Sequence, residues 1–143
     1  AQFFTGRQQV EIMNHYRAHL PEGSGRGSIH GGQTLSALCV SAAATREEAR
    51  EQALVAADAR FSLRTGRPMR FRDPATLDAA YRAEVERYLE RDTAIIVGTY
   101  DEVAQALSSF AENHGTEEVM LISYIDDVEV NTRQNAELAA RRL

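Results

Sequence analysis

Two histidines and a short acidic run have the residue types and spacing that could bind a metal ion. His15 and His19 stand at i, i+4, which places both on one face of a helix. The intervening residues lack the glutamate of an HExxH motif, and no third ligand is evident. Asp126 and Asp127 could bind a cation together with Glu129, but a solvated polar loop is the interpretation we favour. We therefore expect no metal site.

A glycine-rich stretch at 21–32 has the composition of a phosphate-binding loop. The GxxxxGK[ST] pattern is missing, and all 16 of the Lys and Arg residues are arginine. Turn chemistry of this kind predicts a connector loop. The single cysteine, Cys39, lies in an apolar run and is expected to be a buried, inert thiol.

The composition excludes several classes of function. The chain has 143 residues, of which 43% are hydrophobic and 26% charged, and this is typical of one soluble globular domain. A net charge of -5 disfavours binding to nucleic acid or to anionic membrane surfaces. No apolar stretch approaches the roughly 20 residues of a membrane span. Together with the lone cysteine, these features predict a cytoplasmic protein. The opening residues from Ala1 resemble the inside of a domain more than its beginning.

Apolar periodicity and turn residues predict helices that alternate with buried strands. Strands are predicted at 34–44, 94–97 and 119–123, although the first of these could also be the start of a buried helix. Helices are predicted at 8–19, 45–64, 75–91, 99–114 and 128–143. This order indicates an α/β fold with a parallel sheet.

Capping residues mark where three of these helices begin. Thr45 with Glu48, and Thr99 with Glu102, form capping boxes, in which a hydroxyl and a glutamate satisfy free N–H groups at a helix start. Asp73 followed by proline predicts the start of the 75–91 helix. Leucine, tyrosine and valine at steps of four then give that helix a narrow apolar stripe.

Two passages resemble the bacterial luciferase-like flavin-dependent monooxygenases. The first is TLSALCVSAAATREEAREQAL, at 34–54, where the family has a strand and then the helix after the seventh barrel strand. The second is IIVGTYDEVAQALSSFAENHGTEEVMLIS, at 95–123. Its matches to the family's near-C-terminal pattern are Val97, Gly98, Thr99, Glu102 (or Asp101), Val103, Leu107, Gly115, Glu118, Val119 and Met120. The basic stretch at 63–68 resembles the family's mobile segment, so 64–92 is expected to be an insertion.

The resemblance implies the C-terminal part of a (β/α)8 barrel. Such a barrel needs roughly 250 residues, so the N-terminal part, or another subunit, would have to complete the sheet. The family implies reduced FMN from a separate flavin reductase, oxygen, a small organic substrate and a homodimer. The alternatives are a deazaflavin-dependent oxidoreductase of the same fold and a non-catalytic flavin-binding or scaffold subunit.

Barrel active sites lie at the C-terminal ends of the strands, which gives candidate residues. Ser41 would end the seventh strand, and Ser123 and Tyr124 the eighth, where they could contact a flavin or substrate. The alternative is a hydroxyl bonded to nearby backbone. Arg64 and Arg67 could form a lid over an anionic flavin, with Arg70 and Arg72, or could lie in a solvated loop. No catalytic residue is assigned.

Overall fold

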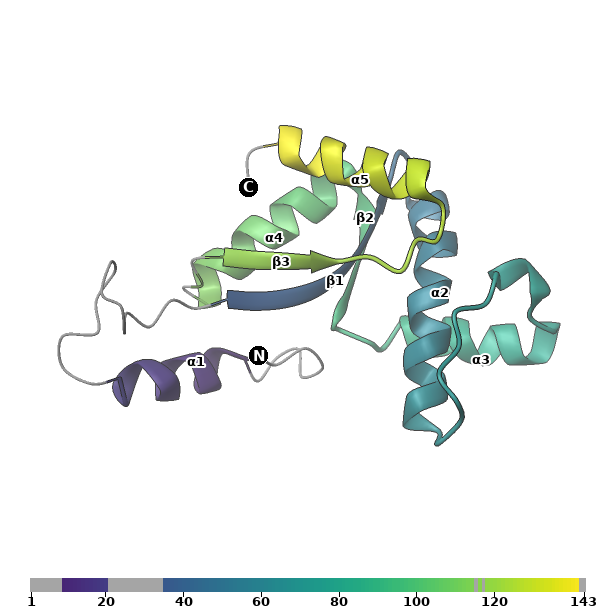
Figure 1. The fold of residues 1–143 in the computed structure, drawn as a ribbon, viewed down its shortest axis with the longest axis horizontal. Coiled ribbons are helices and arrows are strands. Elements are labelled where there is room, and N and C mark those ends of the chain that lie inside the picture. The colour runs from purple at the N-terminus through teal and green to yellow at the C-terminus, as the bar shows by residue number, and fades with distance from the viewer. Residues whose placement is uncertain (1–8, 21–34, 115, 117, 142–143) are drawn as a thin grey trace.

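The computed structural model describes residues 9–20, 35–114, 116 and 118–141. The elements in chain order are α1 (Gln9–Ala18), β1 (Leu35–Ala43), α2 (Arg46–Arg64), the 3-10 helix η2 (Pro74–Thr76), α3 (Ala79–Leu89), β2 (Ile95–Thr99), α4 (Tyr100–His114), β3 (Glu118–Ile122) and α5 (Val128–Ala140) (Figure 1). The predicted order of helices and strands is confirmed. The connector at 21–32 and Gly115 lie outside the described residues.

The three strands form a parallel sheet in the order β2-β1-β3. The central strand β1 divides its length between two neighbours. Its first half, Leu35–Cys39, pairs with β3, and its second half, Cys39–Ala43, pairs with β2. The predicted parallel sheet is confirmed, and β1 is buried along almost all of its length, as expected from its continuous apolar sequence.

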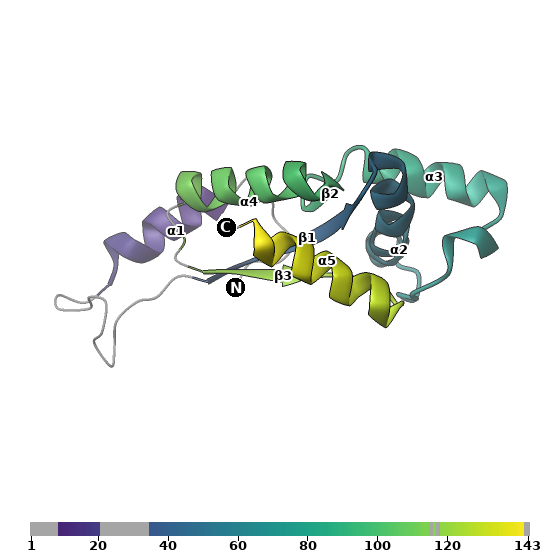
Figure 2. The ribbon, with the colours of Figure 1, turned by 90° about the horizontal axis from the view of Figure 1, so that it is seen from above.

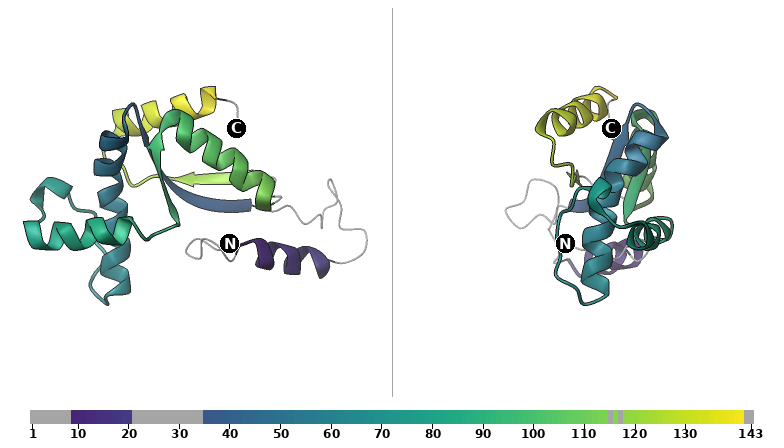
Figure 3. Two further views of the ribbon diagram at one scale, coloured as in Figure 1. Left: turned by 180° about the vertical axis from the view of Figure 1, so that it is seen from behind. Right: turned by 90° about the vertical axis from the view of Figure 1, so that its right-hand side faces the viewer.

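Alternate residues of β1 face two separate cores. Leu38, Val40 and Ala42 pack against α4 and α5, where Leu107 and Leu138 are buried. Figure 3 shows α4 lying against the sheet when the molecule is seen from behind. Cys39 points to the other core, formed with small residues of α2 and with Val85 and Leu89 of α3. Helices α2 and α3 therefore lie together at one end of the molecule, and α1 lies at the other (Figure 2).

The last strand is less buried than its apolar sequence predicts. Glu118 and Met120 of β3 are exposed, whereas Val119 and Leu121 pack against the α4–α5 core. Among the described elements, β3 pairs only with β1, and only one of its faces meets helices. The expectation of a buried strand at 119–123 is therefore wrong among the described residues.

The helix predicted at 75–91 begins later than its Asp-Pro start indicates. The Asp73 carboxylate does accept from the Ala75 N–H at 2.9 Å, but it caps only the short helix η2. Leu77 is extended, and Asp78 then caps α3 by accepting from the Tyr81 N–H at 2.9 Å. The α-helix begins at the second cap because an extended residue cannot continue the first one.

Of the two predicted capping boxes, the one at Thr99 is complete, and the one at Thr45 is observed in its hydroxyl half. Thr45 accepts from the Glu48 N–H at 3.2 Å. The Thr99 N–H donates to Glu102 Oε2 at 2.9 Å, and the Glu102 N–H donates to the Thr99 hydroxyl at 3.4 Å. These caps set where α2 and α4 leave the sheet, immediately after β1 and β2.

Candidate functional site

A groove of about 510 Å³ opens where the chain leaves β1 and β3. Its volume is within the range of small-molecule sites. One wall comes from α2, the second from the segment before η2, and the third from the β3–α5 connection. The lining residues are Glu51, Gln52, Val55, Phe71, Arg72, Asp73, Pro74, Ile125, Asp126, Asp127 and Val130. The carboxyl ends of parallel strands are the usual place for ligands in α/β folds.

An aromatic pair joins two of these walls. Phe71, which is 58% exposed, stacks on Tyr124 with ring centroids 5.3 Å apart and planes inclined by 24°. Tyr124 lies two residues beyond the end of β3 and packs against the core around Cys39. Its burial raises the pKa of the Tyr124 hydroxyl, which therefore stays a neutral phenol at physiological pH. The pair fixes residue 71 to the end of the sheet.

Residues 67–78, called the strap below, are anchored by a buried carboxylate. Asp58 on α2 is fully buried and receives Arg72 Nε at 2.8 Å and Arg72 Nη2 at 2.5 Å. The Tyr81 hydroxyl donates to the same carboxylate at 2.8 Å, and the Arg72 guanidinium lies over the Tyr81 ring. Hydrogen bonding to Asp58 raises the pKa of Arg72. The Arg72 guanidinium therefore anchors the strap to Asp58, although Arg72 also lines the groove.

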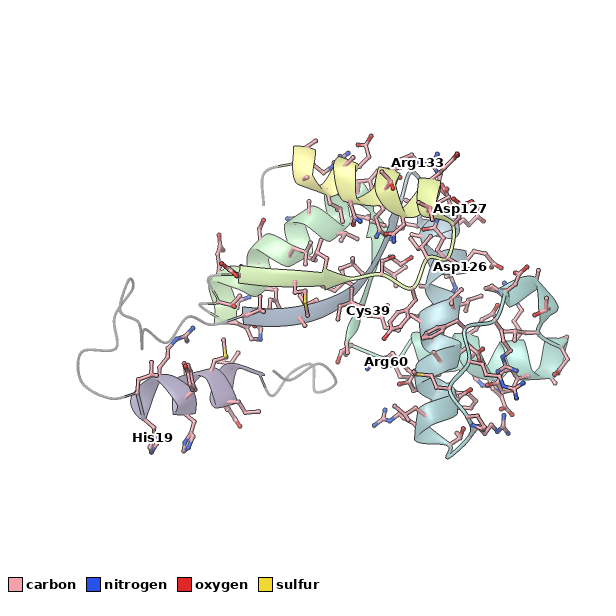
Figure 4. All side chains as sticks on the ribbon, in the orientation of Figure 1. His19, Cys39, Arg60, Asp126, Asp127 and Arg133 are labelled. Atoms are coloured by element: carbon pink, nitrogen blue, oxygen red, sulfur yellow. The ribbon has the colours of Figure 1, made fainter. Side chains whose placement is uncertain are left out.

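Acidic side chains form the rim of the groove. Glu51 is paired with Arg82 of α3. Asp73 and Asp127 each use one oxygen, Oδ1, to cap a helix. Figure 4 shows Asp126 and Asp127 between the end of β3 and the first turn of α5. Within the described part of the chain, Asp73, Asp126 and Asp127 form no ion pair.

The two predicted serines bond to nearby backbone. Ser41 is buried against α2 and donates to the Ala49 carbonyl at 2.8 Å. Ser123 accepts from the Ile125 N–H at 3.3 Å. Of the three predicted strand-end residues, only Tyr124 contacts the groove, through Phe71. A ligand-binding role for Ser41 or Ser123 stays a prediction.

The predicted lid arginines lie outside the groove, apart from Arg72. Arg64 is exposed in the last turn of α2, and Arg70 is exposed in the strap. Arg67 lies over the Tyr81 ring at 5.3 Å. The sequence did not single out Phe71. The available sequence signal was an aromatic residue between two arginines in a stretch with loop-like composition.

The histidines and the cysteine do not contribute to this groove. The rings of His15 and His19 lie 4.1 Å apart on α1, and the His19 Nδ1 atom is 2.8 Å from the His15 carbonyl oxygen. In the part of the chain that the structure describes, no group of three or more His, Cys, Asp or Glu could hold a metal ion. Burial raises the pKa of the Cys39 thiol to about 12, which leaves it unreactive. His30 lies outside the described residues.

The described residues do not fit the phosphate of a flavin mononucleotide. Helix N-termini bind phosphate well when they are free of negative charge. The helices after the three strands instead carry acids in their first turns: Glu47 and Glu48 in α2, Asp101 and Glu102 in α4, and Glu129 in α5. The groove rim is also acidic. Any flavin phosphate would have to be held by residues other than the described ones.

Comparison with known proteins places the fold. No family model matches the chain, and no curated protein matches its sequence. The crystal structure of apo-MsnO8 matches 97% of this chain with a TM-score of 0.72 and 21% identity. DmoA from Hyphomicrobium sulfonivorans matches 96% of the chain with a TM-score of 0.49 and 19% identity. The chain spans 43% of the MsnO8 chain and 36% of the DmoA chain. At these identities the MsnO8 match establishes the fold alone. Among the described helices, none is long and apolar enough to cross a membrane.

Proposed function

We propose that this chain is the C-terminal portion of a luciferase-like, flavin-dependent monooxygenase barrel. Nearly the whole chain shares the fold of MsnO8 while covering less than half of its length, which supports a part of a larger barrel. The two sequence passages that resemble the family contain β1, the start of α2, β2, α4 and β3.

The observation that carries the proposal is the pairing of β1 with β3. Consecutive strands of a βα barrel are parallel neighbours, and β1 and β3 are parallel and adjacent over Leu35–Cys39. They would be the seventh and eighth strands. The short strand β2 takes the far edge of β1 over Cys39–Ala43. A preceding barrel strand could then pair with β1 only along 35–38. Beyond residue 38, β2 would separate that strand from β1.

In this proposal the chain supplies one wall of the active-site end, and the cofactor's phosphate is held by other residues. The substrate would be a small organic molecule, and the flavin would be FMN, reduced by a separate reductase. A deazaflavin is the competing cofactor. The homodimer expected from the family is part of the same proposal.

The test combines intact mass with anaerobic flavin titration. The purified protein is weighed by mass spectrometry, to define its chains, and titrated with reduced FMN and, separately, with a reduced deazaflavin. Oxygen uptake is then measured after mixing with air. We expect tight binding of reduced FMN and oxygen uptake above that of free flavin oxidation. Preference for the deazaflavin, or flavin binding without oxygen chemistry, would contradict the proposed activity.

A further inference from the structure

The groove beside α2 combines apolar walls with an uncompensated negative rim. Val55, Phe71, Pro74, Ile125 and Val130 give it an apolar lining. Pockets of this kind bind the apolar body of a ligand, and a few polar groups select its head. The charge of the rim therefore decides which head is accepted.

Two of the charged lining residues are already neutralised. Arg72 is bound by Asp58, and Glu51 by Arg82. The remaining charges are Asp73, Asp126 and Asp127, and each retains a carboxylate oxygen that accepts no hydrogen bond from the described residues. A carboxylate or phosphate entering the groove would be repelled, whereas a cation would be attracted.

A bare metal ion is a poor occupant of the same groove. The described acidic residues include no group arranged to hold one, and apolar walls cannot replace the water that such an ion would lose. An organic cation differs, because its carbon chain can contact these walls while its ammonium group stays at the rim.

One uncharged group in the wall also lacks a donor. Gln52 lines the groove, and its Oε1 atom is buried without a hydrogen-bond partner among the described residues. A buried acceptor left unpaired costs free energy. An ammonium head carries donors and no acceptor, so it matches the chemistry of this unpaired acceptor as well as that of the rim carboxylates.

We propose that the groove binds a hydrophobic amine, with the ammonium among Asp73, Asp126 and Asp127 and the carbon chain along Val55, Phe71 and Val130. Binding itself is independent of the flavin chemistry. That such an amine is the substrate rests on the proposed function, and it makes substrates with an anionic head poor ones.

The test is a titration calorimetry series with three probes that differ only in the head group: octylamine, octanol and octanoate. On the intact protein at low salt and neutral pH, the amine is expected to bind best, by about tenfold or more over octanoate. Added salt should weaken binding of the amine and leave that of the alcohol unchanged. Equal affinities for the three probes, or no binding of the amine, overturn the proposal.

Three variants test whether the binding is in this groove. Asp126→Asn removes a rim charge that caps no helix, and should weaken octylamine about threefold to fivefold without changing octanol. Glu112→Gln removes an exposed charge on α4 and should change neither. Phe71→Ala should weaken both amine and alcohol, because it removes part of the wall. If Asp126→Asn binds octylamine as the unmodified protein does, the amine is not held here.

The flavin titration keeps this proposal separate from the proposed function. Asp126→Asn is expected to bind reduced FMN as tightly as the unmodified protein. Selective amine binding in a protein that binds no flavin would leave the groove assignment intact and end the monooxygenase proposal. Flavin binding with no preference for the amine would end the groove assignment and leave the monooxygenase proposal intact.

Discussion

Gln134 on α5 accepts a hydrogen bond at 2.7 Å from the backbone N–H of Ala42 on β1. Ala42 lies beyond Cys39, where the pairing of β1 with β3 ends. Both residues are buried, and Gln134 is fully so. A buried backbone N–H must find an acceptor, and here a side chain supplies one where β3 has stopped. The shortness of β3 is therefore compensated from the helix that follows it.

Replacing Gln134 with leucine should destabilise the fold. Its Nε2 atom has no hydrogen-bond partner among the described residues, so the polar contribution of the side chain passes through Oε1. Leucine keeps similar bulk and leaves the Ala42 N–H unpaired, at a cost of about 1–3 kcal/mol. Urea unfolding measures the change. Asn135→Ala, on the exposed side of the same helix turn, is the control and should shift the midpoint little. Equal midpoints for both variants would show that the hydrogen bond contributes nothing.

Removing the arginine that anchors the strap should release it. Arg72→Ala leaves the fully buried Asp58 without its guanidinium partner, and one-sided loss of a buried pair is strongly destabilising. Because the Arg72 side chain is 37% exposed, we expect about 2 kcal/mol, below the full range for buried pairs. The readout is the rate of trypsin cleavage after Arg70, which should rise, whereas the bond after Arg67 precedes Pro68 and is not a trypsin site. Arg70→Ala is the control for loss of an arginine from the strap. Because Arg70 is exposed, its free energy of unfolding should be unchanged. Slow cleavage in Arg72→Ala would show that the Phe71–Tyr124 stack suffices to hold the strap.

The sequence predicted the order of the elements and most helix starts, because both depend on local chemistry. The capping boxes at Thr45 and Thr99 need only neighbouring residues; the Thr99 box is present in full, and at Thr45 the hydroxyl caps the Glu48 N–H. The second cap at Asp78 was missed because Asp73 offers an equally good local start. The position of β2 on the far edge of β1 depends on long-range packing of α2 and α4, and no local pattern encodes it.

The candidate site was less predictable than the fold, for a related reason. Reasoning from the strand ends led to Ser41, Ser123 and Tyr124, but one of the three groove walls comes from the strap. The strap is placed by Arg72 bonding to Asp58 and by Phe71 stacking on Tyr124. Both contacts join residues that no spacing rule connects. The sequence grouped Arg72 with the predicted lid arginines, whereas in the structure Arg72 anchors the strap to Asp58 of α2.

The ion pair between Arg46 and Glu102 predicts a specific acid response. The hydrogen bond from Arg46, and then that from the Thr99 N–H, lower the pKa of Glu102 from 4.5 to about 2. A carboxyl with a depressed pKa in the folded state adds stability above its unfolded pKa, and this is lost as pH falls through the folded value. The contribution should therefore fade between pH 4.5 and about 2. Glu102→Gln keeps an acceptor for Thr99 but removes the charge, so its melting temperature should fall less steeply over that window. Both side chains reach solvent, so the effect should also shrink in high salt. If the melting temperatures of the unmodified protein and of Glu102→Gln fall equally over this pH range, solvent fully screens the Arg46–Glu102 pair.

Gly98 is required by how closely Glu102 approaches the end of β2. A Cβ at residue 98 would lie 2.9 Å from Glu102 Oε2 and 3.1 Å from Glu102 Cβ. The carboxylate could swing away, but it would then release the Thr99 N–H, and the Cβ contact would remain. Gly98→Ala should cost roughly 1 kcal/mol through this overpacking. A double-mutant cycle with Glu102→Ala isolates the cause, because contacting residues give non-additive costs. We expect the cost of Gly98→Ala to fall clearly in the Glu102→Ala background, since the carboxylate and the cap are already gone. Additive costs would mean that the contact with Glu102 Oε2 is not the cause, and that the glycine is needed for its backbone or for the Cβ contact that alanine at 102 retains.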